Sequence, residues 1–213
     1  LVPAFVKDDA NQALASEAAA FFFIAAAISL PMAAILLVRH KWASKHKPFQ
    51  YFLSHHKDAA GAFARLLKLE LKSNRKVQGD IFLDSDNLTD LDDLLDVVAF
   101  KVETVIILIT ERVFMRPWCL AELAMAHQQG LDLICLYFAG CDKPSDRFID
   151  SLPSQVLDIE GLARFGLIHV HLQEALLRVQ QCTVNYSMSD TLNPTTLKEL
   201  ASLMVAPQRP WYL

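Results

Sequence analysis

The sequence predicts an α/β domain of the flavodoxin-like, three-layer type, with a parallel sheet of four or five strands, preceded by a single transmembrane helix. From residue 48 onward, short apolar segments alternate with amphipathic ones, as in sheets built from strand–helix–strand units. Residues 105–110, Val-Ile-Ile-Leu-Ile-Thr, form an uninterrupted apolar run that is typical of a strand buried on both faces of a parallel sheet. Residues 18–38 carry no charge and are numerous enough to cross a hydrocarbon core as a helix.

The apolar segment 18–38 explains why the chain is 53% hydrophobic, a high fraction for a soluble protein. Pro31 would kink the helix, which membrane helices tolerate. A cleaved signal peptide is an alternative, but its apolar region is usually shorter, and Arg39-His40-Lys41 is a poor cleavage context. A buried core helix is a second alternative, which the length without a charge disfavours.

The charges on either side of the span predict its orientation. Residues 1–17 are mainly acidic where they are charged, whereas residues 39–47 contain four basic side chains: Arg39, Lys41, Lys45 and Lys47. Basic residues are retained on the cytosolic side, so we expect residues 1–17 to lie outside the cytosol and the following domain to be cytosolic. The basic juxtamembrane segment 39–47 would lie near anionic lipid. Because the chain begins with Leu1 rather than Met, we expect a fragment or a processed product.

The first half of the domain predicts two strands and two helices. Residues 49–54 form the first strand. Asp58 caps a helix that ends at Ser73-Asn74, and its apolar face contains Phe63, Leu66, Leu67 and Leu71. Residues 80–83 form the second strand. The acidic segment 84–90 is rich in Asp, Asn and Ser, which favour turns, and it leads into a short helix over residues 91–99.

The second half predicts two further buried strands, 104–110 and 131–138, with a helix between them that begins near Pro117. Residues 139–161 are rich in loops with one helix, 166–170 form an edge strand, and 173–181 form a helix. We place the domain boundary at residue 182, because the composition of the tail, 183–213, predicts a loop. In this tail Asn193-Pro194 starts a helix that either packs on the domain, which its apolar spacing favours, or docks a partner.

Several classes of α/β protein are excluded by missing motifs. The chain has no G-x-G-x-x-G after a strand, no G-x-x-x-x-G-K-[ST] and no G-x-S-x-G. A phospho-acceptor domain would need acidic residues at the end of the first strand, where Ser54-His55-His56 stands instead. The net charge of −4 does not indicate the basic surface that nucleic-acid binding requires. The four cysteines form no Cys-x-x-Cys pair, so we expect reduced thiols and no metal site.

Three blocks of sequence resemble the Toll/interleukin receptor (TIR) domain family. Residues 52–55, Phe-Leu-Ser-His, resemble its first-strand box, and 81–88, Ile-Phe-Leu-Asp-Ser-Asp-Asn-Leu, its second strand and following loop. Residues 118–123, Trp-Cys-Leu-Ala-Glu-Leu, resemble its third-helix box, closest to the plant type. The resemblance covers residues 48–180 and implies cytosolic signalling in innate immunity through association with other TIR domains.

A subset of TIR domains hydrolyse or cyclise NAD⁺ with a helix glutamate, which aligns here with Glu122, and with an aromatic residue that aligns with Trp118. The resemblance therefore implies that Glu122 is catalytic and that NAD⁺ is a substrate, with no resident cofactor. Trp118 would pack against a nucleotide ring, Ser54 and His55 would lie at the rim of the site, and Asp84 would shape the loop over it. Trp118 and Glu122 are one helical turn apart, so they share a helix face.

Each of these residues also has a structural interpretation. Glu122 suits the positive end of a helix dipole, Trp118 suits a core anchor, and Asp84 suits a turn cap. The loop after the second strand has neither the Gly nor the Pro-Gly of many relatives and is short, which argues against assembly through it. Three hypotheses therefore stay open: a membrane-tethered NAD⁺-cleaving enzyme, a non-catalytic TIR signalling module, and a degenerate paralogue with structural roles.

Overall fold

The computed structural model describes residues 21, 27, 29, 32, 47–84, 92–188 and 193–205. The chain divides into two compact units, residues 1–46 and residues 47–213. In the first unit the four described residues are all helical and exposed. The predicted span 18–38 lies outside the described residues except for these four positions. Among all described residues, no helix has both the length and the apolar character that crossing a membrane requires.

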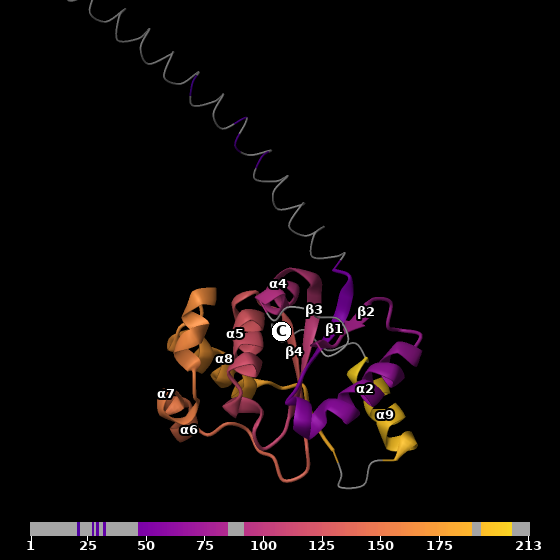
Figure 1. Cartoon of the computed structure of the whole chain (residues 1–213). Coiled ribbons are helices and arrows are strands. Elements are labelled where there is room, and N and C mark those ends of the chain that lie inside the picture. The colour runs from indigo at the N-terminus through magenta and orange to yellow at the C-terminus, as the bar shows by residue number, and fades with distance from the viewer. Residues whose placement is uncertain are drawn as a thin grey trace, which may run out of the picture. The chain divides into compact units, whose positions relative to one another are not determined.

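The second unit is built on a parallel sheet of five strands in the order β2-β1-β3-β4-β5 (Figure 1). The strands are β1 (Phe49–Ser54), β2 (Asp80–Phe82), β3 (Val102–Ile109), β4 (Asp132–Tyr137) and β5 (Asn185–Ser187). This is the flavodoxin-like order, in which the chain reverses its direction of travel across the sheet between β1 and β3. The predicted flavodoxin-like α/β fold, with a parallel sheet of four or five strands, is confirmed for this unit.

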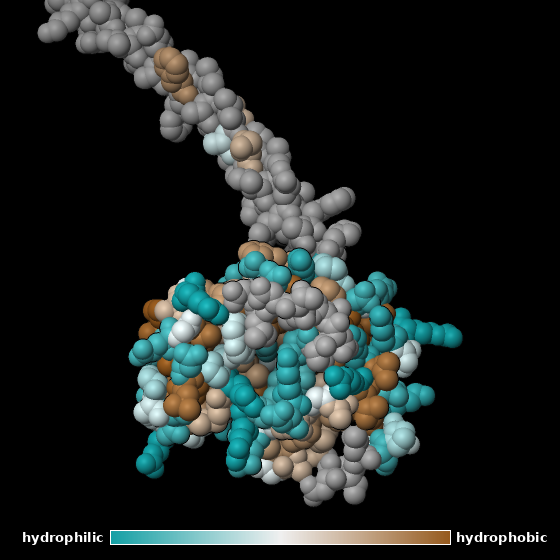
Figure 2. Space-filling view, viewed as in Figure 1, coloured by the Kyte–Doolittle hydropathy of each residue, from teal (hydrophilic) through white to brown (hydrophobic). Residues whose placement is uncertain are grey.

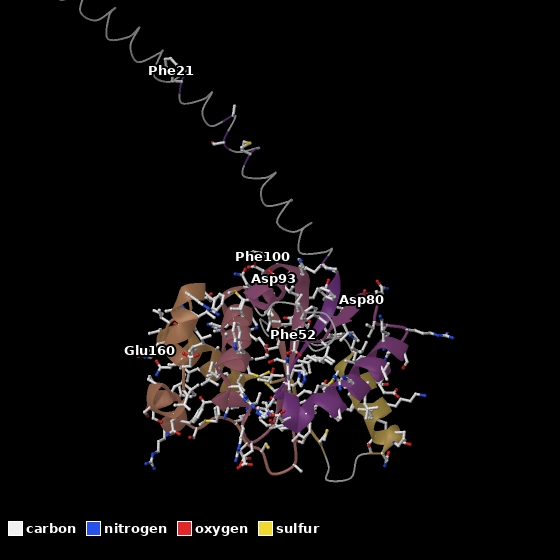
Figure 3. All side chains as sticks on the ribbon, in the orientation of Figure 1. Phe21, Phe52, Asp80, Asp93, Phe100 and Glu160 are labelled. Carbon is white, nitrogen blue, oxygen red and sulfur yellow. The ribbon has the colours of Figure 1, made fainter. Side chains whose placement is uncertain are left out.

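Helices cover both faces of the sheet. Helices α2 (Lys57–Ser73) and α9 (Pro194–Met204) pack on one face, and α4 (Asp92–Lys101), α5 (Pro117–Gln128) and α8 (His169–Gln181) pack on the other (Figure 1). Side chains of each strand alternate between the two layers, so Ile106 packs toward α2 while Ile107 packs toward α5. Hydrophilic residues cover much of the face of this unit that Figure 2 shows. Phe52, on the strand next to the central one, is almost completely buried, and the labelled acidic side chains lie at the periphery (Figure 3).

The first helix differs from the prediction at its cap and on its buried face. His56 is the N-cap rather than Asp58, because its Nδ1 accepts the N–H of Ala59 at 3.2 Å. Asp58 lies in the first turn, where its carboxylate faces the positive end of the helix dipole. Leu66 is 46% exposed, because the stripe that meets the sheet follows different positions. That stripe comprises Ala60, Phe63, Ala64, Leu67 and Leu71.

The segment between β4 and β5 is more helical than the sequence predicts. It contains α6 (Asp146–Asp150), α7 (Leu152–Gln155) and the 3₁₀ helix η2 (Ile159–Phe165) before α8. The predicted edge strand 166–170 is wrong. Gly166 has a φ of 74°, which ends η2, and α8 begins at His169. The apolar residues Ile168 and Val170 are more than half exposed beside the helix start, so the short apolar run does not mark a strand.

The tail supplies the fifth strand of the sheet, so the prediction of a loop after residue 182 is wrong there. β5 pairs with β4 in the register Cys135 with Asn185, and backbone bonds from Cys135 to Val184 (3.0 Å) and from Met188 to Tyr137 (2.8 Å) extend the pairing. The sequence of β5, Asn-Tyr-Ser, is polar because an edge strand of three residues buries little surface.

The last helix, α9, starts where Asn193-Pro194 predicts. The Asn193 side chain accepts the N–H of Thr196 at 2.8 Å, and Thr196 Oγ1 accepts the N–H of Asn193 in return. Its predicted apolar residues Leu197, Leu200 and Met204 are buried against α2 and the sheet. Packing on the domain, the favoured alternative at sequence level, is therefore confirmed for these residues.

Candidate functional site

A pocket of about 300 Å³ lies at the carboxyl ends of β1 and β3. This is the point where the strand order reverses, and open α/β sheets bind their ligands in that crevice. The segment after β1 contributes His55, His56, Lys57 and Asp58 to the wall. Asp84 comes from the segment after β2, and Leu94 comes from α4. The remaining wall is the start of α5: Arg116, Pro117, Trp118, Cys119 and Glu122.

The helix α5 holds Glu122 inside the domain. Pro117 occupies the first helical turn, where its fixed φ favours a helix start. Nearly every following position is buried, because α4 and α8 flank the helix on the sheet. Glu122 consequently has only 4% of its surface exposed, and that position faces the pocket.

The carboxyl of Glu122 is bonded to the end of β1. The hydroxyl of Ser54, itself buried, donates to Glu122 Oε2 at 2.5 Å. Burial raises the pKa of Glu122 to about 8, the Ser54 bond opposes the rise, Asp84 adds to it and Lys57 opposes it. The carboxyl is therefore mostly protonated at neutral pH. A cation placed beside it would favour the ionised form.

Trp118 lies one helical turn before Glu122 and lines the same pocket, as their spacing predicts. Its ring is partly exposed and packs on Phe165 of η2 with centroids 5.6 Å apart. Trp118 thus has one side in the core and another available to a ligand. The two interpretations of this residue, core anchor and stacking surface, both have a structural basis.

The residues at the end of β1 have different roles. His55 lines the pocket, and its Nδ1 donates to the carbonyl of Leu53 at 3.1 Å, because a carbonyl can only accept. Ser54 does not line the pocket but lies behind Glu122, so any influence on a ligand passes through that carboxyl. His56 caps α2, and burial followed by the charge of Arg116 lowers its pKa, so the capping ring is neutral at neutral pH.

Two ion pairs cross the mouth of the pocket. Lys57 Nζ lies 3.0 Å from Asp84 Oδ2, and Arg116 lies 3.1 Å from Asp58. The Lys57–Asp84 pair joins the start of α2 to the end of β2. Asp84 is mostly buried, and within the described ranges its Oδ1 has no hydrogen-bond partner. The residues that follow Asp84, 85–91, include most of the predicted loop and lie outside the described residues, so the expectation about assembly through that loop stays untested.

The structure adds Lys57, Asp58 and Arg116 to the residues that the sequence singles out. Lys57 and Asp58 lie two and three residues after the predicted site residue His55, and Arg116 directly precedes the helix start at Pro117. The signal that could have found them is topological. In a parallel sheet the residues just after each strand gather at one edge, so charged residues there are pocket candidates.

The pocket combines one neutral, desolvated carboxyl with an aromatic ring and two cations that are each paired with an aspartate. Such a site can accept a cationic ring and stabilise positive charge that develops next to Glu122. Over the part of the chain that the structure describes, no group of three or more His, Cys, Asp or Glu side chains could hold a metal ion.

Comparisons with known proteins return a structural similarity alone. No protein-family model and no curated protein sequence matches the chain. Among solved structures, the chain is similar to the TIR domains in the activated Roq1 resistosome directly recognizing the pathogen effector XopQ. That match has 14% sequence identity and a TM-score of 0.47, and it covers 73% of this chain and 99% of the other.

Proposed function

We propose that this chain is a membrane-anchored signalling protein of the TIR class whose pocket cleaves the nicotinamide–ribose bond of NAD⁺, with Glu122 as the catalytic residue. One observation carries the proposal. A buried carboxyl and a partly exposed tryptophan one turn before it face the same pocket at the strand reversal. The three sequence blocks that resemble TIR domains contribute the residues around it.

The reaction suits a site with a single carboxyl. Nicotinamide in NAD⁺ is a cationic leaving group that departs neutral, so breaking its bond to ribose needs no general acid. The charge that develops is a ribosyl oxocarbenium ion, and an ionised Glu122 would stabilise it until a nucleophile, water in the case of hydrolysis, adds to the ribose carbon. The cationic substrate would itself favour the ionised form of Glu122. Trp118 would pack against a ring of the dinucleotide.

Nicotinamide release tests the proposal directly. The full chain is placed on liposomes at high surface density with NAD⁺, and nicotinamide is quantified by chromatography. We expect release that falls roughly 100-fold or more in Glu122→Ala, because the carboxylate would act only in the transition state. Glu160→Ala, a matched change at an exposed glutamate of η2, should keep the wild-type rate. No release from folded wild type at high density would overturn the enzymatic proposal.

A specific observation favours a second candidate, a non-catalytic module that acts through TIR–TIR association. The Ser54–Glu122 bond joins β1 to α5 in the core, and a neutral buried carboxyl is well suited to such a structural bond. Under this alternative, neither the wild type nor Glu122→Ala would turn over NAD⁺ at any density, and Glu122→Ala would only lower stability. The nicotinamide assay therefore separates the two candidates.

The anchor is proposed to be residues 18–38, with the domain on the cytosolic side. The uncharged sequence of that segment and the basic residues 39–47 support this orientation. Confinement to a surface would raise the local concentration of the domains and so favour their association.

Protease protection tests the anchor. A reporter that replaces everything after Lys47 should sediment with membranes and resist protease added outside sealed cells. Digestion of the reporter would reverse the orientation, and its recovery in the supernatant after high-speed centrifugation would remove the anchor.

A further inference from the structure

Two of the four cysteines lie next to each other at the β4–β5 side of the sheet, away from the pocket. Cys135 is in the middle of β4, completely buried, and its side chain packs in the layer of α5 and α8. Cys182 is the C-cap of α8, is partly exposed, and packs against the same layer. The crossover from α8 to β5 brings these two residues together, although they are far apart in the sequence.

The Cys182 sulfur lies next to Cys135, and in its thiol form it can donate its single proton to either of two carbonyl oxygens, a bond that the thiolate form does not have. Its Sγ lies 3.4 Å from the carbonyl oxygen of Leu133 and 3.6 Å from that of Val184. The Val184 carbonyl also accepts the backbone N–H of Cys135 at 3.0 Å. Leu133 and Cys135 are two residues apart in one strand, so their side chains share a face. The Asn185 amide donates to the Cys182 carbonyl at 2.5 Å and holds the turn in place.

The surroundings favour a thiolate at Cys182. The Cys135 thiol donates to its sulfur, and the cations of Arg178 and Lys143 lie nearby, so the pKa of Cys182 is below its usual range. Both cations are fixed, since Lys143 Nζ donates to the Gln180 carbonyl at 2.6 Å and Arg178 donates to the Ala126 carbonyl at 3.4 Å. The pKa of Cys135 is raised, as expected for a thiol that donates to a neighbouring thiolate inside the core.

The other two cysteines lack this environment. Cys119 is buried and donates to the His55 carbonyl at 3.4 Å. Cys141 is partly exposed like Cys182, but burial and the carboxylates of Glu111 and Asp142 raise its pKa. Cys141 is therefore an internal control, because it is a partly exposed thiol with acidic rather than basic neighbours.

We propose that Cys182 is a peroxide-reactive modification site and that Cys135 converts its oxidised form to a disulfide. The Cys182 thiolate attacks one oxygen of hydrogen peroxide, the O–O bond breaks, and the departing hydroxide takes up a proton to give water and a sulfenic acid. The Cys135 sulfur then displaces the sulfenic hydroxyl, which leaves as a second water with the Cys135 proton. Both sulfurs are oxidised to the disulfide level, and one peroxide is reduced to two waters.

The test is oxidation of the fully reduced, full-length chain with one equivalent of hydrogen peroxide at neutral pH. Remaining thiols are alkylated and the peptides are mapped by mass spectrometry. We expect a Cys135–Cys182 cross-linked peptide that dithiothreitol reverses, with loss of the Cys182 thiol at least roughly tenfold faster than loss of the Cys141 thiol. In Cys135→Ser, whose hydroxyl can still donate to the Cys182 sulfur but cannot form a disulfide, dimedone should label Cys182 as a sulfenic acid that persists.

Two variants keep the result interpretable. Cys182→Ser should abolish the cross-link without affecting the buried strand, and Cys141→Ser should leave the cross-link at its wild-type rate. Circular dichroism after each step establishes that the chain is still folded, which matters for the core variant Cys135→Ser. Faster oxidation of Cys141 than of Cys182, or a sulfenic acid at Cys182 that never proceeds to the cross-link in the wild type, would overturn the proposal.

Discussion

The rate of NAD⁺ cleavage, followed as kcat/KM, is expected to rise about tenfold per pH unit below pH 8 and to level off at higher pH. This profile follows from the pKa of Glu122, which burial raises to about 8 in the free protein. The ionised carboxylate is the form that stabilises the ribosyl cation, and kcat/KM reports the ionisation of the free protein. The measurement is nicotinamide release at low NAD⁺ concentration across a pH series.

Substitution of each of three neighbours of Glu122 should shift the midpoint of this pH profile of kcat/KM in a defined direction. Ser54→Ala removes the hydrogen bond that lowers the pKa of Glu122, so its midpoint should shift to higher pH. Lys57→Met removes a cation and should shift it in the same direction. Asp84→Asn removes a negative charge that raises this pKa, so its midpoint should shift to lower pH. A rate that instead falls as pH rises would identify the protonated Glu122 as the active form and contradict the proposed role.

The sequence predicts the central strands and the start of α5 closely, because these elements carry strong local signals. A continuous β-branched run admits few alternatives to a buried parallel strand, and β3 and β4 lie where such runs occur. Pro117 and Asn193-Pro194 predict helix starts for a local reason, since the fixed φ of proline and the side-chain cap act within one turn.

The peripheral elements depend on tertiary pairing, which local patterns do not encode. β5 is the polar tripeptide Asn-Tyr-Ser, and it is a strand because β4 offers an unpaired edge. The apolar residues within 167–170 have the composition of a short strand, which is why the sequence predicts one there. In the structure Leu167 is buried in the core, whereas Ile168 is exposed. His56 caps α2 because its Nδ1 accepts the N–H of Ala59, whereas Asp58 is of the residue type that caps helices more often.

The sequence predicts those residues of the candidate site that lie just after a strand or at the start of the next helix. Trp118, Glu122, His55 and Asp84 all face one pocket, which the order of the parallel strands implies. The hydrogen bond between Ser54 and Glu122 was not predictable, because it requires the register of β1 against α5. The protonated state of Glu122 depends in turn on that bond and on the burial around it.

The difference in the free energy of unfolding between wild type and Glu122→Gln is expected to change by on the order of 5 kcal/mol between pH 4 and pH 9. Between its ordinary pKa of 4.5 and about 8, Glu122 binds a proton in the folded state but not in the unfolded chain. Folding therefore takes up a proton between pH 4.5 and about pH 8, so the free energy of unfolding of the wild type falls as pH rises through this range. The contribution is complete below pH 4.5 and lost above about pH 8.

Glutamine has nearly the same shape, can still accept the Ser54 hydroxyl and does not ionise, so Glu122→Gln should lack this part of the pH dependence. Chemical denaturation at each pH measures both proteins, and the difference between them cancels the titration of other groups, such as His56 and His127. Glu160→Gln makes the same chemical change at the surface (Figure 3) and should run parallel to wild type. Parallel curves for Glu122→Gln and wild type would mean that Glu122 is solvated and ionised in the folded protein. The pH at which the catalytic rate levels off and the pH at which wild-type stability stops falling should coincide, near 8, if a single carboxyl, buried and bonded to Ser54, controls both.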